Sequence, residues 1–477
     1  MSKSFYITTP IYYPNDKLHL GHAYSTVLAD IFARYHALKG DDAFLVTGSD
    51  EHSSKIVRKA NELEVGIKPY LNKIVSNFKI LFKKLNVNYS CFIRTSDRKK
   101  HWPGAIDLWI KLKKADDIYK STYSGLYCVG CETFLKEKDL VGGVCPLHNE
   151  PPQNVTEENY FFRLSRYKNQ LKEIIKTDQL QIIPNKRKKE ILVFLNDEVE
   201  DVSFSRPKSV NNWSIPIPGD DSQGMYVWCD ALTSYLSAIG YPRDKKLFKN
   251  YWPTACHLIG KDILRFHAVI WPAMLLSAKI PLPKIILVHG MLLSGGRKMS
   301  KTLGNVVDPE LLIKKFGVDA VRYFFAAHIP ITTDGEINET LVAERYNSDL
   351  VNGLGNLISR VLGMAILYKT PIHTGPDFQL VLKQNSWYSK SLDEFDLHKV
   401  TNKILEKIQT LDKKIAKEEP FKVIKTNKTQ AHRLISDYLQ EIWTLSQLLK
   451  PIMPNTSQSI QDAFKYKKKP ILFRRIS

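Results

Sequence analysis

The first fifty residues alternate between strand-like apolar runs and apolar positions at helical spacing. Residues 5–9 and 43–47 are compact apolar and β-branched runs, closed by Pro10 and Gly48, as expected of buried strands. Between them, five apolar residues recur at helical spacing before Gly40, a typical helix stop: Val27, Leu28, Ile31, Tyr35 and Leu38. A strand, a helix and a strand in this order predict parallel pairing with a right-handed crossover.

The same alternation returns in the second half of the chain. Residues 255–260 and 284–288 are strand-like, and residues 263–276 between them have a helical pattern. Around 116–160 the pattern breaks into Gly, Pro and Cys, which is typical of an inserted module. The sequence therefore predicts an α/β Rossmann-type nucleotide-binding domain split by an insertion. Two unrelated α/β domains would give the same periodicity.

From about residue 345 onward, every strong apolar pattern is helical. Two series advance by three or four residues at each step: Leu397, Val400, Ile404, Ile408, Leu411 and Ile415, then Leu434, Tyr438, Ile442, Leu445 and Leu449. Such stripes are typical of helices that pack against one another. We predict an all-α C-terminal domain.

Composition narrows the class of protein. The 477 residues are 43% hydrophobic and 25% charged, which excludes a chain disordered throughout. No run approaches the ~20 apolar residues of a membrane helix, and the first residues lack the apolar core of a signal peptide. We therefore expect a cytoplasmic protein with no membrane partner. The net charge, 69 − 49 = +20, favours a nucleic-acid partner, although a surface filled with lysine for compositional reasons would give the same value.

Three of the six cysteines cluster with a histidine. Cys128 and Cys131 form a Cx₂C pair, and after thirteen intervening residues Cys145 and His148 form a Cx₂H pair. This spacing is typical of a tetrahedral Cys₃His zinc site, in which four protein ligands leave no position for a catalytic water. We expect one structural Zn²⁺, held in the insertion, and no disulfide framework.

Two short motifs indicate phosphate chemistry. His19-Leu-Gly-His22 follows the first strand and opens the first helix, which places two imidazoles at a helix N-terminus, where phosphate binds readily, and Gly21 lets a ligand approach the backbone. The second motif, residues 295–304, is a glycine-flanked loop that contains Lys298 and Lys301. Lysines in such a loop suit closure over a transferring phosphate. The two motifs in this order are far more specific than either alone.

HLGH and KMSKT resemble the two signatures of class I aminoacyl-tRNA synthetases. Longer stretches are similar to bacterial or organellar methionyl-tRNA synthetases: YITTPIYYPN at 6–15, TGSDEH at 47–52, YVWCDA at 226–231, HLIGKD at 257–262 and FH at 266–267. The resemblance spans the chain and is strongest up to about residue 365. It implies a catalytic domain in two halves, a connective insertion with the zinc knuckle near 120–155, a linker that contacts the tRNA stem, and a helical anticodon-binding domain. In chain order, the boundaries are 1–115, 116–225, 226–305, 306–345 and 346–477.

The resemblance also assigns roles to individual residues. His19, Gly21, His22 and Asp262 would hold ATP, while Lys298 and Lys301 would stabilise the charge that develops on the phosphates. Asp50 would pair with the substrate ammonium. Nine residues would line an adaptable apolar pocket for the methionine side chain: Ile11, Tyr13, Trp228, Ala231, Leu232, Tyr235, Phe266, His267 and Trp271. By themselves, the large aromatic residues of this set would equally suit an ordinary core.

In the helical domain, Asn356 and Arg360 lie four residues apart, so that both share one helix face suited to base-edge recognition. The resemblance places the anticodon reader here and a base-stacking aromatic residue at Phe421. The chain departs from the family at two places. Phe421 stands where the family has Trp, and Ser53 stands where it commonly has Gly. A packing role for Phe421 behind Pro420 is the alternative.

A protein of this kind would join L-methionine to tRNA(Met), initiator tRNA included, through methionyl-adenylate, with Mg²⁺ accompanying ATP. We expect a monomer, since the chain ends shortly after the helical domain. Cysteinyl, leucyl and valyl enzymes are rivals within the class. The last two carry an editing insertion larger than residues 116–225 can hold, and the first needs zinc with an open position. A non-catalytic RNA-binding paralogue is the rival outside the class, and the two intact motifs argue against it.

Overall fold

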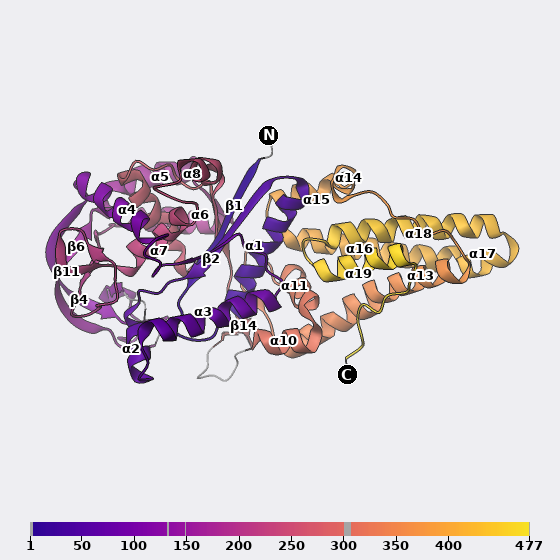
Figure 1. The fold of residues 1–477 in the computed structure, drawn as a ribbon, viewed down its shortest axis with the longest axis horizontal. Helices are drawn as coiled ribbons and strands as arrows, with labels where there is room; N and C mark the ends of the chain where they lie inside the picture. Colours follow the sequence, from indigo (N-terminus) through magenta and orange to yellow (C-terminus); the bar gives the residue numbers. More distant parts are fainter. Residues whose placement is uncertain (1–2, 131–132, 148, 300–306, 477) are drawn as a thin grey trace.

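The computed structural model describes residues 3–130, 133–147, 149–299 and 307–476. The molecule is elongated, with an α/β body at one end and a bundle of long helices at the other (Figure 1). Helix α1 (Leu20–Lys39) lies where the two bodies meet. It ends as predicted at Gly40, whose φ of 101° is the left-handed conformation that favours glycine.

The α/β body is built on a six-stranded parallel sheet of order β3-β2-β1-β12-β13-β7. In chain order, the strands are β1 (Ser4–Tyr12), β2 (Asp42–Ser49), β3 (Cys91–Arg94), β7 (Gln181–Ile183), β12 (Cys256–Gly260) and β13 (Ile285–His289). Ile7 of β1 is in register with Cys256 of β12. Both halves of the chain therefore share one sheet. The Rossmann-type prediction is confirmed, and the alternative of two unrelated domains is wrong.

The segment between the halves forms two small antiparallel sheets. One has the order β5-β4-β6-β8 and the other β10-β11-β9. Their strands are β4 (Ile118–Cys128), β5 (Thr133–Leu135), β6 (Gln153–Phe162), β8 (Val202–Ser203), β9 (Ser205–Pro207), β10 (Pro216–Ile217) and β11 (Asp220–Met225). Within the same segment, β7 pairs with β13 and extends the parallel sheet. The stretch expected to be wholly inserted thus contributes an edge strand to the parallel sheet.

Helices cover the sheet and connect it to the bundle. Those of the α/β body are α2 (Ser54–Glu62), α3 (Ile67–Lys84), α4 (Trp102–Lys114), α5 (Lys168–Lys176), α6 (Asn185–Phe194), α7 (Val227–Ser237), α8 (Lys245–Tyr251) and α9 (Trp271–Ser277). Helices α10 (Pro309–Phe316) and α11 (Val318–Ala327) follow. Helix α1 packs on β1 and β2 with one face and on α11 with the other, which explains why Val27, Leu28 and Ile31 are fully buried.

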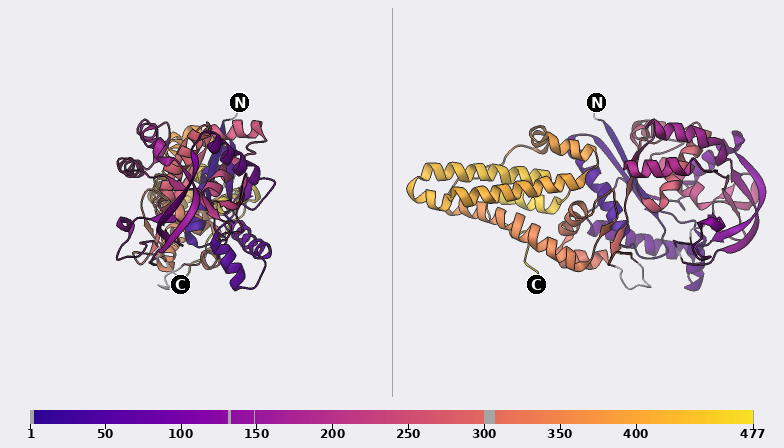
Figure 2. Two further views of the ribbon diagram at one scale, coloured as in Figure 1. Left: turned by 90° about the vertical axis from the view of Figure 1, so that its left-hand side faces the viewer. Right: turned by 180° about the vertical axis from the view of Figure 1, so that it is seen from behind.

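The C-terminal part is helical, as predicted. It comprises α12 (Glu339–Arg345), a π-helical stretch (Tyr346–Gly355), α13 (Asn356–Leu367), α14 (Phe378–Gln384), α15 (Ser386–Asp393), α16 (Leu397–Glu418), α17 (Pro420–Thr426), α18 (Lys428–Leu449) and α19 (Pro454–Tyr466). The long helices run side by side (Figure 2). All six residues of the first apolar stripe, from Leu397 to Ile415, are buried on α16.

One helix among the described residues departs from the membrane expectation. Residues Glu339–Leu367 form a continuous helix of 29 residues, and its most apolar 18-residue window has a mean hydropathy of 1.5, enough by length and composition to cross a membrane. The sequence shows no unbroken apolar run here because Asp349 and Arg360 interrupt it. In the structure the helix lies in the bundle, with Leu354, Leu357 and Val361 buried in the core.

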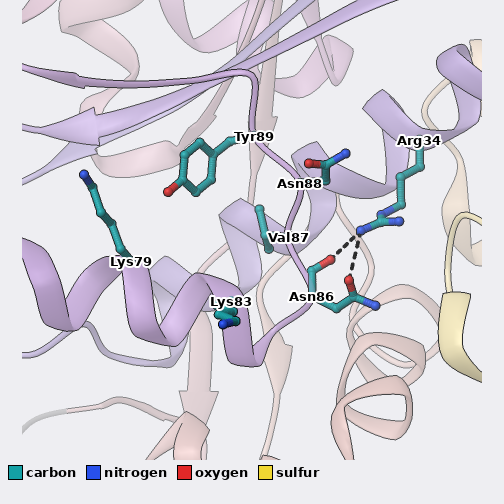
Figure 3. Close-up of a pocket in the computed structure, with 7 residues that line it drawn as sticks. All are labelled: Arg34, Lys79, Lys83, Asn86, Val87, Asn88 and Tyr89. Atoms are coloured by element: carbon teal, nitrogen blue, oxygen red, sulfur yellow. Dashed lines mark hydrogen bonds between the residues drawn. The ribbon is translucent and has the colours of Figure 1, made fainter.

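A buried ion pair joins the two bodies. On α11, Arg322 is 0% exposed and lies 2.7 Å from the carboxylate of Asp30 on α1. The same guanidinium donates hydrogen bonds to the carbonyls of Pro451 and Ile452, which precede α19. Arg34 also binds Asp30 and donates to Asn86 beside a hollow of about 590 Å³ (Figure 3). Charge and backbone hydrogen bonds therefore fix the bundle against α1.

Candidate active site

The strand order of the parallel sheet reverses between β1 and β12. From β1 the chain proceeds outward to β2 and β3 on one side, and from β12 it proceeds to β13 on the other. In open parallel sheets, ligands bind at the carboxyl ends of the strands beside such a reversal. His19 follows β1 and Asp262 follows β12. The sheet thus brings these two predicted site residues to one edge.

The two histidines of the first motif cap helix α1. Nδ1 of His19 accepts a hydrogen bond from the amide of Gly21, and Nδ1 of His22 accepts one from the amide of His19, each at 3.1 Å. The rings are stacked, with centroids 3.7 Å apart. Because Nδ1 is the acceptor in both rings, the neutral imidazoles carry their proton on Nε2. Two aligned N–H donors thus stand at the positive end of a helix.

Burial lowers the pKa of His22 well below its usual range, and the neighbouring His19 lowers it further. At neutral pH His22 is therefore an uncharged hydrogen-bond donor.

Gly21 has a role that the sequence did not indicate. A Cβ at this position would lie 3.0 Å from Cε1 of His19, so a side chain here would displace the capping imidazole.

A second contact ties β13 to the first turns of α1. Nε2 of His289 lies 2.7 Å from the hydroxyl of Ser25, while its Nδ1 donates to the carbonyl of Gly290. Burial lowers the pKa of His289, although nearby Asp262 opposes this shift. Asp262 therefore lies close to the helix that carries the two histidines. The sequence analysis missed His289 and Ser25, which belong to no recognisable motif.

The lysine motif begins in a hairpin formed by β14 (Leu292–Ser294) and β15 (Arg297–Lys298). Gly295 and Gly296 both have positive φ, 65° and 70°, as a tight two-residue turn requires. The carboxylate of Glu336 accepts hydrogen bonds from both glycine amides. Glu336 belongs to β16 (Gly335–Glu336), which pairs with β14. The backbone of Lys298 lies in the hairpin, and the predicted Lys301 lies outside the described residues.

The predicted methionine pocket contains two sets of buried hydrogen bonds made by aromatic side chains. The Tyr235 hydroxyl donates to Nε2 of His267 at 2.8 Å, and Nδ1 of His267 donates to the carbonyl of Ile263. The indole of Trp271 donates to Nε2 of His257 at 3.2 Å. Burial lowers the pKa of His267 to about 4. The ring is therefore neutral at pH 7, with the tautomer set by its two partners.

The other members of the predicted pocket are buried or partly buried. Trp228 and Phe266 are partly buried and stacked, with centroids 3.7 Å apart. Ile11 and Tyr13 are also partly buried, whereas Ala231, Leu232 and Trp271 are buried. Asp50 is 3% exposed. Burial, then the charges of Tyr12 and Asp50, raise the pKa of Tyr235.

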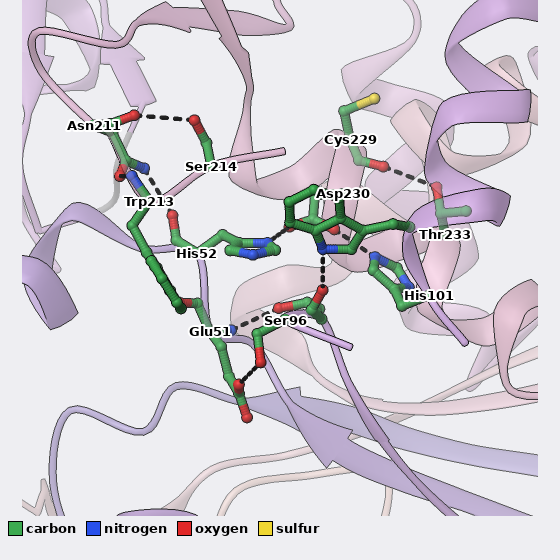
Figure 4. Close-up of polar contacts among 12 residues, drawn as sticks. Glu51, His52, Ser96, His101, Asn211, Trp213, Ser214, Cys229, Asp230 and Thr233 are labelled. Atoms are coloured by element: carbon green, nitrogen blue, oxygen red, sulfur yellow. Dashed lines mark hydrogen bonds and ion pairs between the residues drawn. The ribbon is translucent and has the colours of Figure 1, made fainter. Parts of the chain in front are cut away.

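Next to Asp50 lies a polar cluster that the sequence analysis did not single out (Figure 4). The carboxylate of Asp230 lies 2.6 Å from Nδ1 of His52 and 2.5 Å from Nε2 of His101. Burial raises the pKa of Asp230, but the two histidines outweigh it and hold the pKa at about 2. Asp230 and His52 fall inside the motifs YVWCDA and TGSDEH. Membership in these motifs is the sequence signal that could have identified them.

Two of the four predicted zinc ligands lie in the described part of the chain. Cys128 ends β4 and Cys145 follows the short bridge between Val141 and Val144. Both side chains are buried, at 2% and 1% exposure. Cys131 and His148 lie outside the described residues, and no group of three metal-ligating side chains occurs in the part that is described. Thiolates of this kind are ligands that Zn²⁺ accepts.

The remaining predicted residues lie on helix surfaces or caps. On α13, Asn356 is exposed and Arg360 forms an ion pair with Asp412 of α16. Phe421 is 41% exposed on α17, directly after buried Pro420. Ser53 takes an extended conformation, and its hydroxyl accepts a hydrogen bond from the amide of Lys55 as the N-cap of α2. A helix cap explains how serine serves at this position.

Comparison with known proteins decides between the members of class I. The family model for tRNA synthetases class I (M) matches residues 5–154 and 138–362. Methionine–tRNA ligase of Caldanaerobacter subterraneus subsp. tengcongensis is 40% identical over 474 residues, covering 96% of this chain and 74% of the relative. The chain belongs to the methionyl-tRNA synthetases. The methionine–tRNA ligase of Thermotoga maritima is 36% identical over 98% of this chain and 76% of its own.

Solved methionyl-tRNA synthetases have the same fold. The Mycobacterium tuberculosis methionyl-tRNA synthetase in complex with methionyl-adenylate superposes with a TM-score of 0.88 at 34% identity, covering 96% of this chain and 93% of that one. A second structure of that protein bound to methionyl-adenylate gives 0.89 at 33% identity over 100% and 99% of the two chains. The resemblance read from the sequence is therefore confirmed.

The buried state of His267 makes stability depend on pH. The unfolded chain binds a proton at this histidine below pH ~6.5, whereas the folded protein binds it only below about 4. The free energy of unfolding should therefore fall as pH drops from 6.5 to 4, by about 3 kcal/mol from this residue. His267→Gln should lose less stability across that window in urea denaturation. The exposed His373 supplies the control, since His373→Gln should follow the wild-type slope. Parallel slopes for His267→Gln and wild type would contradict the prediction.

Proposed function

We propose that the chain activates L-methionine with ATP and transfers it to tRNA(Met), initiator tRNA included. The methionine carboxylate attacks the α-phosphate, so that methionyl-adenylate forms and pyrophosphate leaves. A ribose hydroxyl of the terminal adenosine then takes the methionyl group and AMP leaves. The stacked pair of His19 and His22 at the reversal of the sheet carries this proposal, because it offers two Nε2–H donors where a triphosphate binds.

Catalysis in this proposal is alignment plus charge stabilisation, with no covalent enzyme intermediate. His19 and His22 donate Nε2–H to the nucleotide, while Asp262 contacts it from the end of β12. Lys298 and Lys301 close over the phosphates from the hairpin whose turn is fixed by Glu336. Mg²⁺ bound to ATP would neutralise phosphate charge. Asp50 holds the substrate ammonium, and the methionine side chain lies among Trp228, Phe266 and the other predicted pocket residues.

The pocket chemistry favours methionine within the class. The aromatic side chains present flat apolar surfaces to a thioether, and both buried histidines already have partners for their ring nitrogens. The site therefore needs no metal to bind the amino acid, unlike the cysteinyl alternative. Pyrophosphate exchange with methionine, cysteine, leucine and valine tests the assignment. Exchange with methionine alone is expected, and exchange driven by another amino acid, or by none, would overturn it.

We further propose one structural Zn²⁺ bound by Cys128, Cys131, Cys145 and His148, which would cross-link the turns around β4. The tRNA would lie along the elongated molecule with its anticodon at Asn356, Arg360 and Phe421. The net charge of +20 suits this polyanionic partner. A cytoplasmic monomer remains our expectation, and sedimentation that shows a dimer at micromolar concentration would contradict it.

Lys301→Ala should slow adenylate formation strongly and change methionine affinity little. A charge that acts mainly in the transition state affects kcat, typically by ~10²–10³-fold for one lost stabilising group. Pyrophosphate exchange at saturating methionine measures the effect, and Lys314→Ala on the following helix α10 is the matched control with wild-type rates. Equal rates for Lys301→Ala and wild type would remove this lysine from the mechanism.

Cys145→Ser should lower the zinc content, which elemental analysis of the wild-type protein should find to be about one per chain. The melting temperature should fall with it, because structural zinc contributes folding free energy. Cys91→Ser changes a partly buried thiol outside the knuckle and should retain the metal. Full zinc occupancy in Cys145→Ser would show that Cys145 is no ligand.

Phe421→Ala should reduce kcat/KM for tRNA by about 5- to 150-fold, the effect of losing one base–aromatic stacking contact. Phe421→Trp should be neutral or better, since indole offers a larger stacking face. Neither change should alter pyrophosphate exchange. The half-exposed ring supports stacking over packing. An equal loss on wild-type and anticodon-mutated tRNA, together with a lower melting temperature, would instead make Phe421 a packing residue.

A further inference from the structure

Asp230 is the centre of a buried His–Asp–His cluster that connects three elements. Its two carboxylate oxygens bind His52 at the end of β2 and His101 before α4, and Asp230 itself lies in the first turn of α7. None of the three residues is more than 2% exposed. A carboxylate with two histidine donors in a dry site is geometrically well defined. The cluster thus fixes where β2 ends relative to α7.

Hydrogen bonds from other segments hold the backbone of the two residues that follow Asp50. The indole of Trp213 donates to the carbonyl of Glu51 at 2.8 Å, and the side-chain amide Nδ2 of Asn211 donates to the carbonyl of His52 at 2.7 Å. The amide of Glu51 donates to the hydroxyl of Thr95 at 2.7 Å. The carboxylate of Glu51 also binds Arg94. Residues 51 and 52 therefore cannot shift without breaking several buried hydrogen bonds (Figure 4).

Helix α7 carries the opposite wall of the same pocket. Trp228 and Ala231 flank Asp230 in its first turns, and Asp50 lies two residues before His52. The Asp230–His52 contact is thus a direct link between the carboxylate proposed for the substrate ammonium and the wall proposed for the substrate side chain.

We propose that Asp230 is a positioning residue that sets the distance between Asp50 and the α7 wall of the methionine pocket. It acts through His52, with His101 holding the other oxygen. This inference rests on the proposed function. Asp230 itself touches no substrate. The consequence is a specific effect on the binding of an amino acid that must contact both walls, with ATP binding untouched.

Pyrophosphate exchange with Asp230→Asn tests this role. The KM for methionine should rise roughly 10- to 100-fold, the usual effect of removing a group that orients a binding residue, while the KM for ATP stays at the wild-type value. Asp117→Asn is the matched control. Asp117 is likewise buried at 2% exposure and accepts hydrogen bonds from Arg166, Tyr167 and Ser277. It should lower the melting temperature without changing either KM.

A double-mutant cycle separates positioning from general loosening. If Asp230 acts through Asp50, then adding Asp230→Asn to Asp50→Asn should raise the methionine KM much less than it does alone. Additive effects, or an unchanged methionine KM in Asp230→Asn, would overturn the inference. If Asp230→Asn does not fold, His101→Asn takes its place with the same expected split between methionine and ATP. Absence of methionine-dependent exchange in the wild type would instead refute the proposed function.

Discussion

The parallel pairing of β1 with β12 is the constraint on which the rest of the structure depends. These strands come from opposite halves of the chain, and their contact creates the reversal of strand order at the centre of the sheet. The helix that follows β1 and the turn that follows β12 must then emerge at one edge. His19, His22 and Asp262 come together for this reason.

Periodicity predicted those parts of the fold that are long and one-sided. The α16 stripe from Leu397 to Ile415 and the stop of α1 at Gly40 follow directly from side-chain spacing and backbone conformation. Strand β7 could not be predicted in this way. Its three residues are too few to show an alternation, and only the exposed edge of β13 makes them a strand. The long helix 339–367 was likewise hidden because charged residues such as Asp349 and Arg360 interrupt its apolar pattern.

The residues of the candidate site likewise divide into those that the sequence predicts and those that it does not. Residues within sequence motifs, such as His19 and His22, could be identified because their spacing alone implies a shared helix end. His101 and His289 act through contacts between segments far apart in the chain, and no local pattern encodes such contacts. Gly21 was identified for a different reason from the one the structure gives, since the nearest atoms to its missing side chain belong to His19.

Glu336 connects the lysine hairpin to the long helix that carries the proposed anticodon-binding residues. Its carboxylate holds the turn of the lysine hairpin, and three residues later the chain enters the helix Glu339–Leu367. The length of that helix determines how far apart its two ends lie. Asn356 lies 17 residues after Glu339 along this helix, and ten of the residues between them form the π-helical stretch Tyr346–Gly355. The separation between the phosphate loop and the proposed anticodon face is therefore set by helix length and not by a flexible linker. An insertion of four α-helical residues before Asn356 would lengthen the helix by about 6 Å and turn the proposed anticodon face by about 40° about the axis, so that the two ends would no longer fit the same tRNA.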